Sequence, residues 1–225
     1  MTPASAVKRG ISQSIPMFIP AIPFALVFGI VVANSGISGL LGWSSSPIMF
    51  GGAAQITVLT LLGEGASVVS AVTAALIVGA RHLLYSVTLA PRFRNQPTWF
   101  RWLGPYVLID QVFALTMVNH EEDPRAFRQY FLASGFTFWS LWMTFTGLGL
   151  FIGPVVPAEW QLSFAAPVLF MGLLAVSVDN WRKVAVAGVA MVLTLLLADL
   201  PHRTGLLFAA LIAVALGLVL ERLRR

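Results

Sequence analysis

Long apolar segments separated by short polar stretches run through the whole of the 225-residue chain. There are eight of these segments, at about residues 14–33, 47–62, 66–90, 99–118, 130–152, 162–178, 184–200 and 205–221. A helix that spans a bilayer needs about 20 predominantly apolar residues. The pattern therefore predicts an all-α integral membrane protein with a single transmembrane domain over residues 1–225. The first segment is longer than the apolar core of a signal peptide, so we expect it to be retained as a helix.

Two of the segments are short, rich in glycine and proline, and begin with similar sequences. Residues 47–52 read PIMFGG and residues 167–172 read PVLFMG, an offset of 120. Gly29 and Gly149 match at the same offset. Several matches at one offset indicate an internal duplication. We therefore expect two repeat halves, at 8–120 and 128–225.

The distribution of lysine and arginine predicts how the segments cross the membrane, because cytoplasmic loops are enriched in these residues. If all eight segments cross, nine basic residues lie on the side of the N-terminus and four on the other. If 47–62 and 162–178 enter and leave by the same side, the division becomes ten to three. We therefore expect six full crossings plus two re-entrant half-helices in an inverted repeat, an arrangement that recurs in transporters. Both termini are then cytoplasmic.

Composition agrees with the membrane assignment and excludes several other classes. The chain is 58% hydrophobic and 10% charged, with a mean hydropathy of +0.85, whereas soluble domains carry about 25% charged residues. It has no cysteine and only three widely separated histidines, so we expect no metal and no cofactor. The net charge of +5 follows from residues that orient membrane helices, and we expect no nucleic-acid partner. The chain has no nucleotide-binding or nucleophile-elbow motif, so we do not expect an enzyme.

The segment at 66–90 contains the most promising polar side chains. Arg81 is a basic residue well inside an apolar segment, where a charge must face protein or water. Tyr85 lies four positions later, on the same helix face, and arginine can bind both oxygens of a carboxylate. We therefore expect Arg81 and Tyr85 to bind substrate; the alternative is a structural arginine. His82 is a candidate for proton coupling, or else a structural polar group.

Asp110 is the carboxylate embedded in the middle of the segment at 99–118. An isolated buried carboxylate is driven towards its neutral form, so Asp110 must pair with a cation or exchange a proton. We assign it a role in proton coupling. The alternative is a static ion pair with Arg81 that holds two segments together.

The segment at 47–62 predicts a half-helix that begins inside the membrane. Residues 44–46 are serines and precede Pro47, which is typical of a helix start. Gly51, Gly52 and Gln55 follow, and the N-terminal amides of such a helix favour an anionic group. We expect these three residues to line a substrate site. Tight helix packing is the alternative explanation for the glycines.

These motifs resemble the AzlC family, the large subunit of bacterial branched-chain amino-acid exporters. The resemblance rests on FALVFG at 24–29, GGAAQ at 51–55, RHLLYS at 81–86 with LAP at 89–91, and Asp110 with Ala114–Leu115. It implies a permease subunit for neutral, apolar amino acids and a small hydrophobic AzlD-type partner. Gln111 stands where the family would lead us to expect an acidic residue, so a two-carboxylate coupling scheme does not transfer.

The sequence thus predicts a secondary transporter subunit in the bacterial inner membrane that exports branched-chain or other neutral apolar amino acids, coupled to protons. Its partners would be the AzlD-type subunit, the amino-acid substrate and membrane lipid. One alternative is a non-transporting membrane scaffold or assembly subunit, in which Arg81 and Asp110 form a structural pair. A second is an intramembrane enzyme that uses Asp110 and His82.

Overall fold

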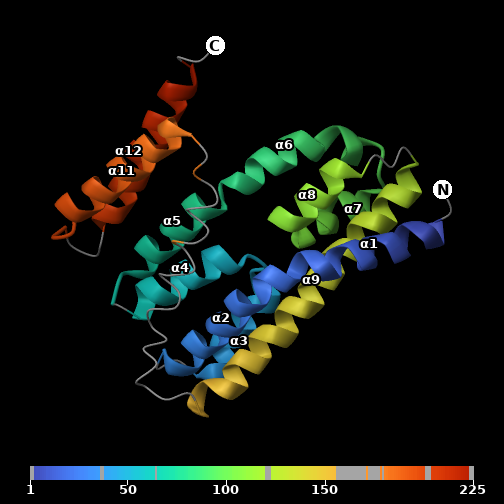
Figure 1. Ribbon diagram of the computed structural model, residues 1–225, viewed down its shortest axis with the longest axis horizontal. Helices are drawn as coiled ribbons and strands as arrows, with labels where there is room; N and C mark the ends of the chain where they lie inside the picture. The colour runs from blue at the N-terminus through green and yellow to red at the C-terminus, as the bar shows by residue number, and fades with distance from the viewer. Residues whose placement is uncertain are drawn as a thin grey trace.

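The computed structural model describes residues 3–35, 38–63, 65–119, 123–155, 171, 178, 180–200 and 204–222. All regular structure in these ranges is helical (Figure 1). The segment expected at 162–178 and its PVLFMG sequence lie almost entirely outside the described residues. The duplication itself therefore stays a prediction.

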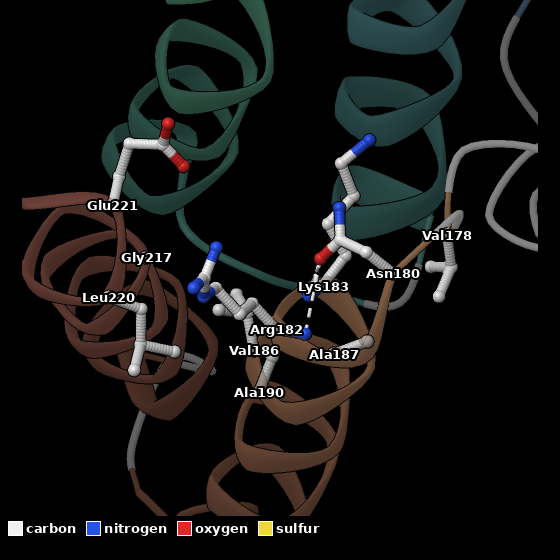
Figure 2. Close-up of a pocket in the computed structure, with 10 residues that line it drawn as sticks. All are labelled: Val178, Asn180, Arg182, Lys183, Val186, Ala187, Ala190, Gly217, Leu220 and Glu221. Carbon is white, nitrogen blue, oxygen red and sulfur yellow. Dashed lines mark hydrogen bonds between the residues drawn. The ribbon is translucent and has the colours of Figure 1, made fainter. Parts of the chain in front are cut away.

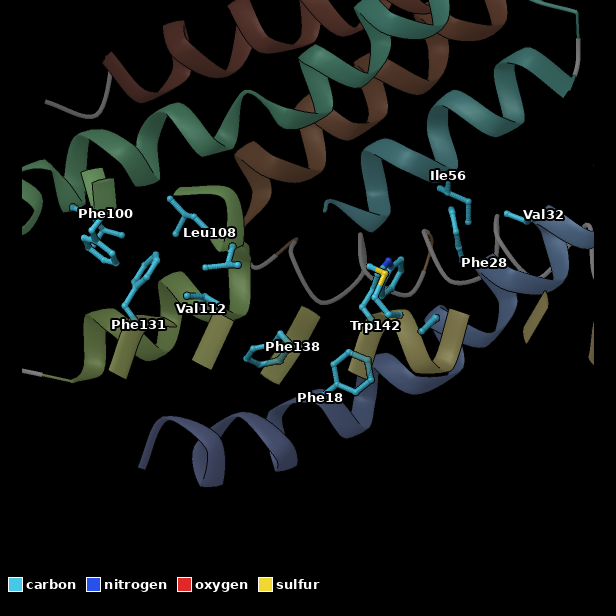
Figure 3. Packing of buried hydrophobic residues seen from close by; sticks show 14 of the residues in the cluster. Phe18, Phe28, Val32, Ile56, Phe100, Leu108, Val112, Phe131, Phe138 and Trp142 are labelled. Atoms are coloured by element: carbon cyan, nitrogen blue, oxygen red, sulfur yellow. The ribbon is translucent and has the colours of Figure 1, made fainter. Parts of the chain in front are cut away.

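The centre of the fold is a pair of long, parallel helical rods. The first is α1 (Pro3–Phe18), a 3-10 turn η1 (Ile19–Ala21) and α2 (Ile22–Asn34); the second is α9 (Pro124–Ile152) with η3 (Gly153–Val155). Residue numbers in the two rods rise together: the Phe18 and Phe138 rings lie 6.0 Å apart, and those of Phe24 and Trp142 lie 5.7 Å apart. The rods enclose an aromatic core that continues into neighbouring helices (Figure 3).

Gly29 and Gly149, the two glycines matched in sequence at an offset of 120, meet where α2 crosses α9. A Cβ on Gly29 would lie 2.1 Å from the Thr146 carbonyl oxygen, and one on Gly149 would lie 2.1 Å from the Leu26 carbonyl oxygen. Only glycine permits this backbone approach. The matched residues sit on parallel rods, whereas equivalent helices of an inverted repeat run in opposite directions through the membrane. For this pair of helices the structure differs from the inverted arrangement expected from the charge distribution.

Two continuous rods within the described residues are long and apolar enough to span a bilayer, Ser5–Asn34 and Pro124–Val155. A third candidate is a bent pair, α5 (Val68–Gly79) and α6 (Arg81–Arg94), which meet at 40°. Eight spanning segments are thus not confirmed. We call the end of the bundle where α1 and α9 begin the basic end, and the opposite end the far end.

The segment at 99–118 is not the single crossing helix that its length suggested. It consists of α7 (Thr98–Leu103), a 3-10 turn η2 (Gly104–Val107), two extended residues and α8 (Asp110–Val118). Phe100 stacks on Phe93 at the basic end, and α8 returns there, because the carbonyl oxygen of Thr116 accepts a hydrogen bond from Arg92. We call α7–η2–α8 the second hairpin. It enters and leaves at the same end of the bundle.

The first hairpin, α3 (Gly39–Ile48) and α4 (Gly52–Gly63), approaches from the far end. Gly39 lies beside Leu150 near the end of α9, and Gly52 lies against Trp142, about ten residues before that end. Ile56 then returns to the core around Phe28 and Val32 (Figure 3). The reversal falls at residues 49–51.

The expectation that residues 44–46 cap a helix beginning at Pro47 is wrong. These serines and Pro47 lie inside α3, and the next helix starts at Gly52. The Ser44 and Ser45 hydroxyls donate to the carbonyl oxygens of Leu41 and Gly42, three residues back, as serines inside helices do. The helix ends at Ile48, directly after the proline, and Met49 has left the helical conformation.

The remaining described helices, α11 (Trp181–Leu196) and α12 (Thr204–Arg222), pack on each other beside α5 (Figure 1). Large apolar side chains are exposed on both, for example Met191 and Leu195 on α11 and Phe208 and Leu218 on α12. A pair of helices with this surface is suited to lipid or to other apolar helices.

Candidate functional site

The tips of the two hairpins meet in the middle of the bundle. Tyr106, in η2, donates a hydrogen bond from its hydroxyl to the carbonyl oxygen of Pro47 at the end of α3, 2.5 Å away. The indole of Trp139 donates to the same Tyr106 hydroxyl at 2.8 Å. Next to them, Val107 packs so closely against α9 that a Cβ on Gly135 would lie 2.4 Å from its side chain.

A cluster of Arg81, Tyr85 and Asp110 lies between the bent pair and the second hairpin. Nη1 of Arg81 is 3.0 Å from Oδ2 of Asp110, and the Tyr85 hydroxyl donates to Oδ1 of the same carboxylate, also at 3.0 Å. The Tyr85 ring stacks on Phe113 in α8, with centroids 4.3 Å apart. Each carboxylate oxygen therefore has its own partner, and both partners come from α6.

Helix interruptions place these side chains. Asp110 is the first residue of α8, where the positive end of the helix dipole favours a carboxylate. Arg81 is the first residue of α6, directly after the bend at Ala80. The His82 ring crosses that bend, with Nδ1 2.9 Å from the Gly79 carbonyl oxygen, so Nδ1 carries the hydrogen. The His82 ring also meets the edge of the Tyr85 ring at 5.7 Å.

The Arg81–Asp110 contact uses only part of the guanidinium. One nitrogen meets the carboxylate, and the buried Nε has no hydrogen-bond partner. About 39% of the Arg81 side chain and 42% of the Asp110 side chain are exposed. The pair is therefore accessible to a ligand, and arginine has the geometry to hold a second carboxylate through two parallel hydrogen bonds.

Gln55 lies apart from this cluster and joins α4 to α3. Its side chain is 1% exposed, and its amide nitrogen lies 3.0 Å from the hydroxyl oxygens of Ser45 and Ser46. When the amide oxygen and nitrogen of Gln55 exchange places, the oxygen accepts from the Ser46 backbone N–H at 3.1 Å and from both serine hydroxyls. The nitrogen then donates to the Met49 carbonyl oxygen at 3.0 Å. These bonds brace the reversal of the first hairpin.

Gly51 and Gly52 differ in their surroundings. A Cβ on Gly52 would lie 2.6 Å from the Trp142 ring and 2.8 Å from that of Phe24, so this glycine is needed for packing. A Cβ on Gly51 would meet nothing within 4 Å among the described residues. At the N-terminus of α4, the space beside Gly51 is therefore free of described atoms, whereas the space beside Gly52 is filled by aromatic rings.

Sequence reasoning missed a set of contacts at the basic end. Arg92 donates to the carbonyl oxygens of Thr116 and Asn119 at 2.8 and 3.1 Å, which satisfies the end of α8. Arg128 donates to Gln96, whose amide donates to the carbonyl oxygen of Pro124. An arginine two residues past the end of an apolar segment resembles the many arginines that flank membrane helices, so no sequence pattern singled out Arg92.

A separate cavity of about 380 Å³ lies between α11 and α12 (Figure 2). Its polar lining residues are Asn180, Arg182, Lys183 and Glu221, and its other lining residues are apolar. None of the seven residues predicted to form the site lines it. Within the described part of the chain, no three histidine, aspartate or glutamate side chains come together to hold a metal.

The fold and the site define a helical membrane protein in which two interrupted hairpins, one from each end of the bundle, meet near an ion pair. Residues 16–156, more than half of the sequence, match the model of the family described as AzlC protein. The chain belongs to the AzlC family.

Its relatives are membrane proteins. It is 28% identical to an uncharacterized membrane protein of Archaeoglobus fulgidus over 94% of each chain. It is 30% identical to the inner membrane protein YgaZ of Escherichia coli, over 82% of this chain and 78% of YgaZ. A Helicobacter pylori membrane protein is 23% identical over 96% of this chain. No solved structure matches it.

Proposed function

We propose that this chain is the permease subunit of a secondary transporter that exports branched-chain or other neutral, apolar amino acids across the bacterial inner membrane. The proposal gives the chain no enzymatic activity. The observation that carries it is the Arg81–Asp110–Tyr85 cluster at two helix interruptions. Interrupted helices meeting in mid-membrane around charged side chains are a recurrent transporter design.

Arg81 supplies a fixed positive charge for the substrate carboxylate. It lies 11 residues before Arg92 along α6, which is about 16 Å of helix and thus about half of a 30 Å hydrocarbon core. A charge at this depth is costly unless it is paired or lines a polar path. Half-exposed Arg81 and Asp110 fit a path that opens to one side of the membrane at a time.

The basic end is cytoplasmic in this proposal. Seven basic residues lie on elements that begin or end there: Lys8, Arg9, Arg92, Arg94, Arg101, Arg125 and Arg128. No described lysine or arginine lies on the elements at the far end of the rods, between residues 34 and 68. This asymmetry favours a cytoplasmic N-terminus. Arg182, Lys183 and Arg222 mark one end of the α11–α12 pair in the same way, which favours a cytoplasmic C-terminus.

An AzlD-type subunit is proposed as the partner, and the exposed apolar faces of α11 and α12 are suited to such a chain. The test is affinity purification from native membranes in mild detergent. A stoichiometric small hydrophobic chain supports the partnership, and a chain that purifies alone and still transports contradicts it.

The transport proposal is tested in inside-out membrane vesicles, where export appears as uptake and native partners are retained. Vesicles containing the chain should accumulate labelled L-leucine when their interior is acidified, above vesicles without it. The absence of gradient-dependent uptake of every neutral amino acid would favour the scaffold, in which Arg81 and Asp110 are only a structural ion pair.

A further inference from the structure

Arg81 and Asp110 place one positive and one negative charge side by side, which complements the carboxylate and ammonium of an amino-acid zwitterion. The guanidinium and carboxylate meet through a single contact of 3.0 Å, and both side chains are about two-fifths exposed. Tyr85 holds the second carboxylate oxygen of Asp110 from the same helix as Arg81. The Tyr85 hydroxyl therefore orients the Asp110 carboxylate independently of Arg81.

We infer that the substrate enters this ion pair and takes over both of its charges. Arg81 binds the α-carboxylate, and Asp110 binds the α-ammonium with Tyr85 fixing its position. This inference rests on the proposed function and adds a specificity-determining role for Asp110. The side chain of the amino acid then meets the apolar surroundings, which include Phe113 and Ile109.

Charge balance explains why a zwitterion suits this site and a single charge does not. With a zwitterion bound, each protein charge exchanges one opposite charge for another, and the site stays neutral. A hydroxy acid would pair Arg81 and leave Asp110 without a cation, while an amino-acid amide would do the reverse. Leaving one charge of an ion pair without its partner is costly where water reaches that charge only in part, as it does Arg81 and Asp110.

The first test needs no variant. Inside-out vesicles take up labelled L-leucine in the presence of excess unlabelled L-leucine, its 2-hydroxy acid analogue, or L-leucine amide. L-leucine should compete fully and the two single-charge analogues weakly. Competition by either analogue as strong as that by L-leucine overturns the inference while leaving leucine transport, and so the proposed function, intact.

The second test assigns the ammonium site to Asp110. In Asp110→Asn, leucine uptake should fall at least about tenfold, because a charge-assisted bond to the substrate is lost, and discrimination against the hydroxy acid should largely disappear. The matched control Asp199→Asn changes an exposed carboxylate outside the cluster and should keep both properties. An Asp110→Asn protein that transports slowly but discriminates as the wild type does overturns the inference.

Discussion

The hydroxyl of Tyr106 donates a hydrogen bond to the carbonyl oxygen of Pro47, 59 residues earlier in the chain, and so joins the tips of two hairpins that approach from opposite ends of the bundle. The backbone N–H of Gly51 bonds the Met49 carbonyl oxygen in the reversal, so the Pro47 carbonyl oxygen at the end of α3 accepts from Tyr106 instead, and Tyr106 lies just before the extended residues that precede Asp110. The link thus connects the two places where helices are interrupted.

Removing this link should impair transport more than stability. Tyr106→Phe keeps the ring but deletes the donor to Pro47 and the acceptor for Trp139, at a cost of about 1 kcal/mol for each hydrogen bond. Leucine uptake should fall severalfold while thermal stability drops slightly. Tyr130→Phe is the matched control, because its hydroxyl bonds Gln13 at the basic end; it should lose similar stability and keep its transport rate.

The second hairpin predicts that residues before and after it lie on one side of the membrane. The chain has no cysteine, so single cysteines can be labelled without background. Exposed Arg101→Cys and Arg125→Cys should both react with a membrane-impermeant maleimide from the cytoplasmic side. Ser38→Cys, exposed at the far end, should react only from the outside. Labelling of residues 101 and 125 from opposite sides would show that 99–118 crosses the membrane.

Replacing Arg81 by lysine should separate its geometry from its charge. Arg81→Lys keeps a cation next to Asp110 but loses the planar fork that binds both oxygens of a carboxylate. Leucine uptake should fall by about tenfold, mainly because KM rises, while the amount of protein in the membrane stays at the wild-type level. The exposed Arg101→Lys provides the control. Wild-type KM in Arg81→Lys would remove Arg81 from the substrate site.

The crossing of α2 and α9 should tolerate no side chain at Gly29. A Cβ there would lie 2.1 Å from a backbone oxygen, so Gly29→Ala should force the rods apart at a cost of about 1–3 kcal/mol or more. Gly188→Ala is the control within α11, where an added Cβ meets no described atom within 4 Å and alanine is the better helix former. Thermal unfolding in detergent should show a clear fall for the first and none for the second. Equal unfolding temperatures would argue against the close crossing.

The sequence predicted the parts of the fold that depend on local pattern. Apolar segment lengths locate the helices at 14–33 and 130–152, and charges embedded in apolar segments identify Arg81 and Asp110. Helix spacing alone predicts that Tyr85 shares a face with Arg81. All three come together in the structure.

The sequence predicts that 47–62 enters and leaves by one side, but it does not reveal that 99–118 also reverses. The segment at 99–118 has the length of a full span, and Gly104–Pro105 at its centre marks the interruption that the apolar count concealed. The serines before Pro47 resembled a helix start, but their hydroxyls found carbonyl oxygens in the preceding turn. Gln55 lies against those serines, a contact that depends on the reversal and not on local pattern.

The measurement that tests the account most directly is gradient-driven uptake of labelled L-leucine into inside-out vesicles by the doubly neutral variant Arg81→Gln with Asp110→Asn. Removing both charges leaves no unpaired ion. The amount of this double variant in the membrane should therefore be closer to that of the wild type than the amount of either single variant. The account predicts that this well-folded protein does not transport. Leucine uptake at the wild-type rate would contradict it and leave Arg81 and Asp110 as a structural pair.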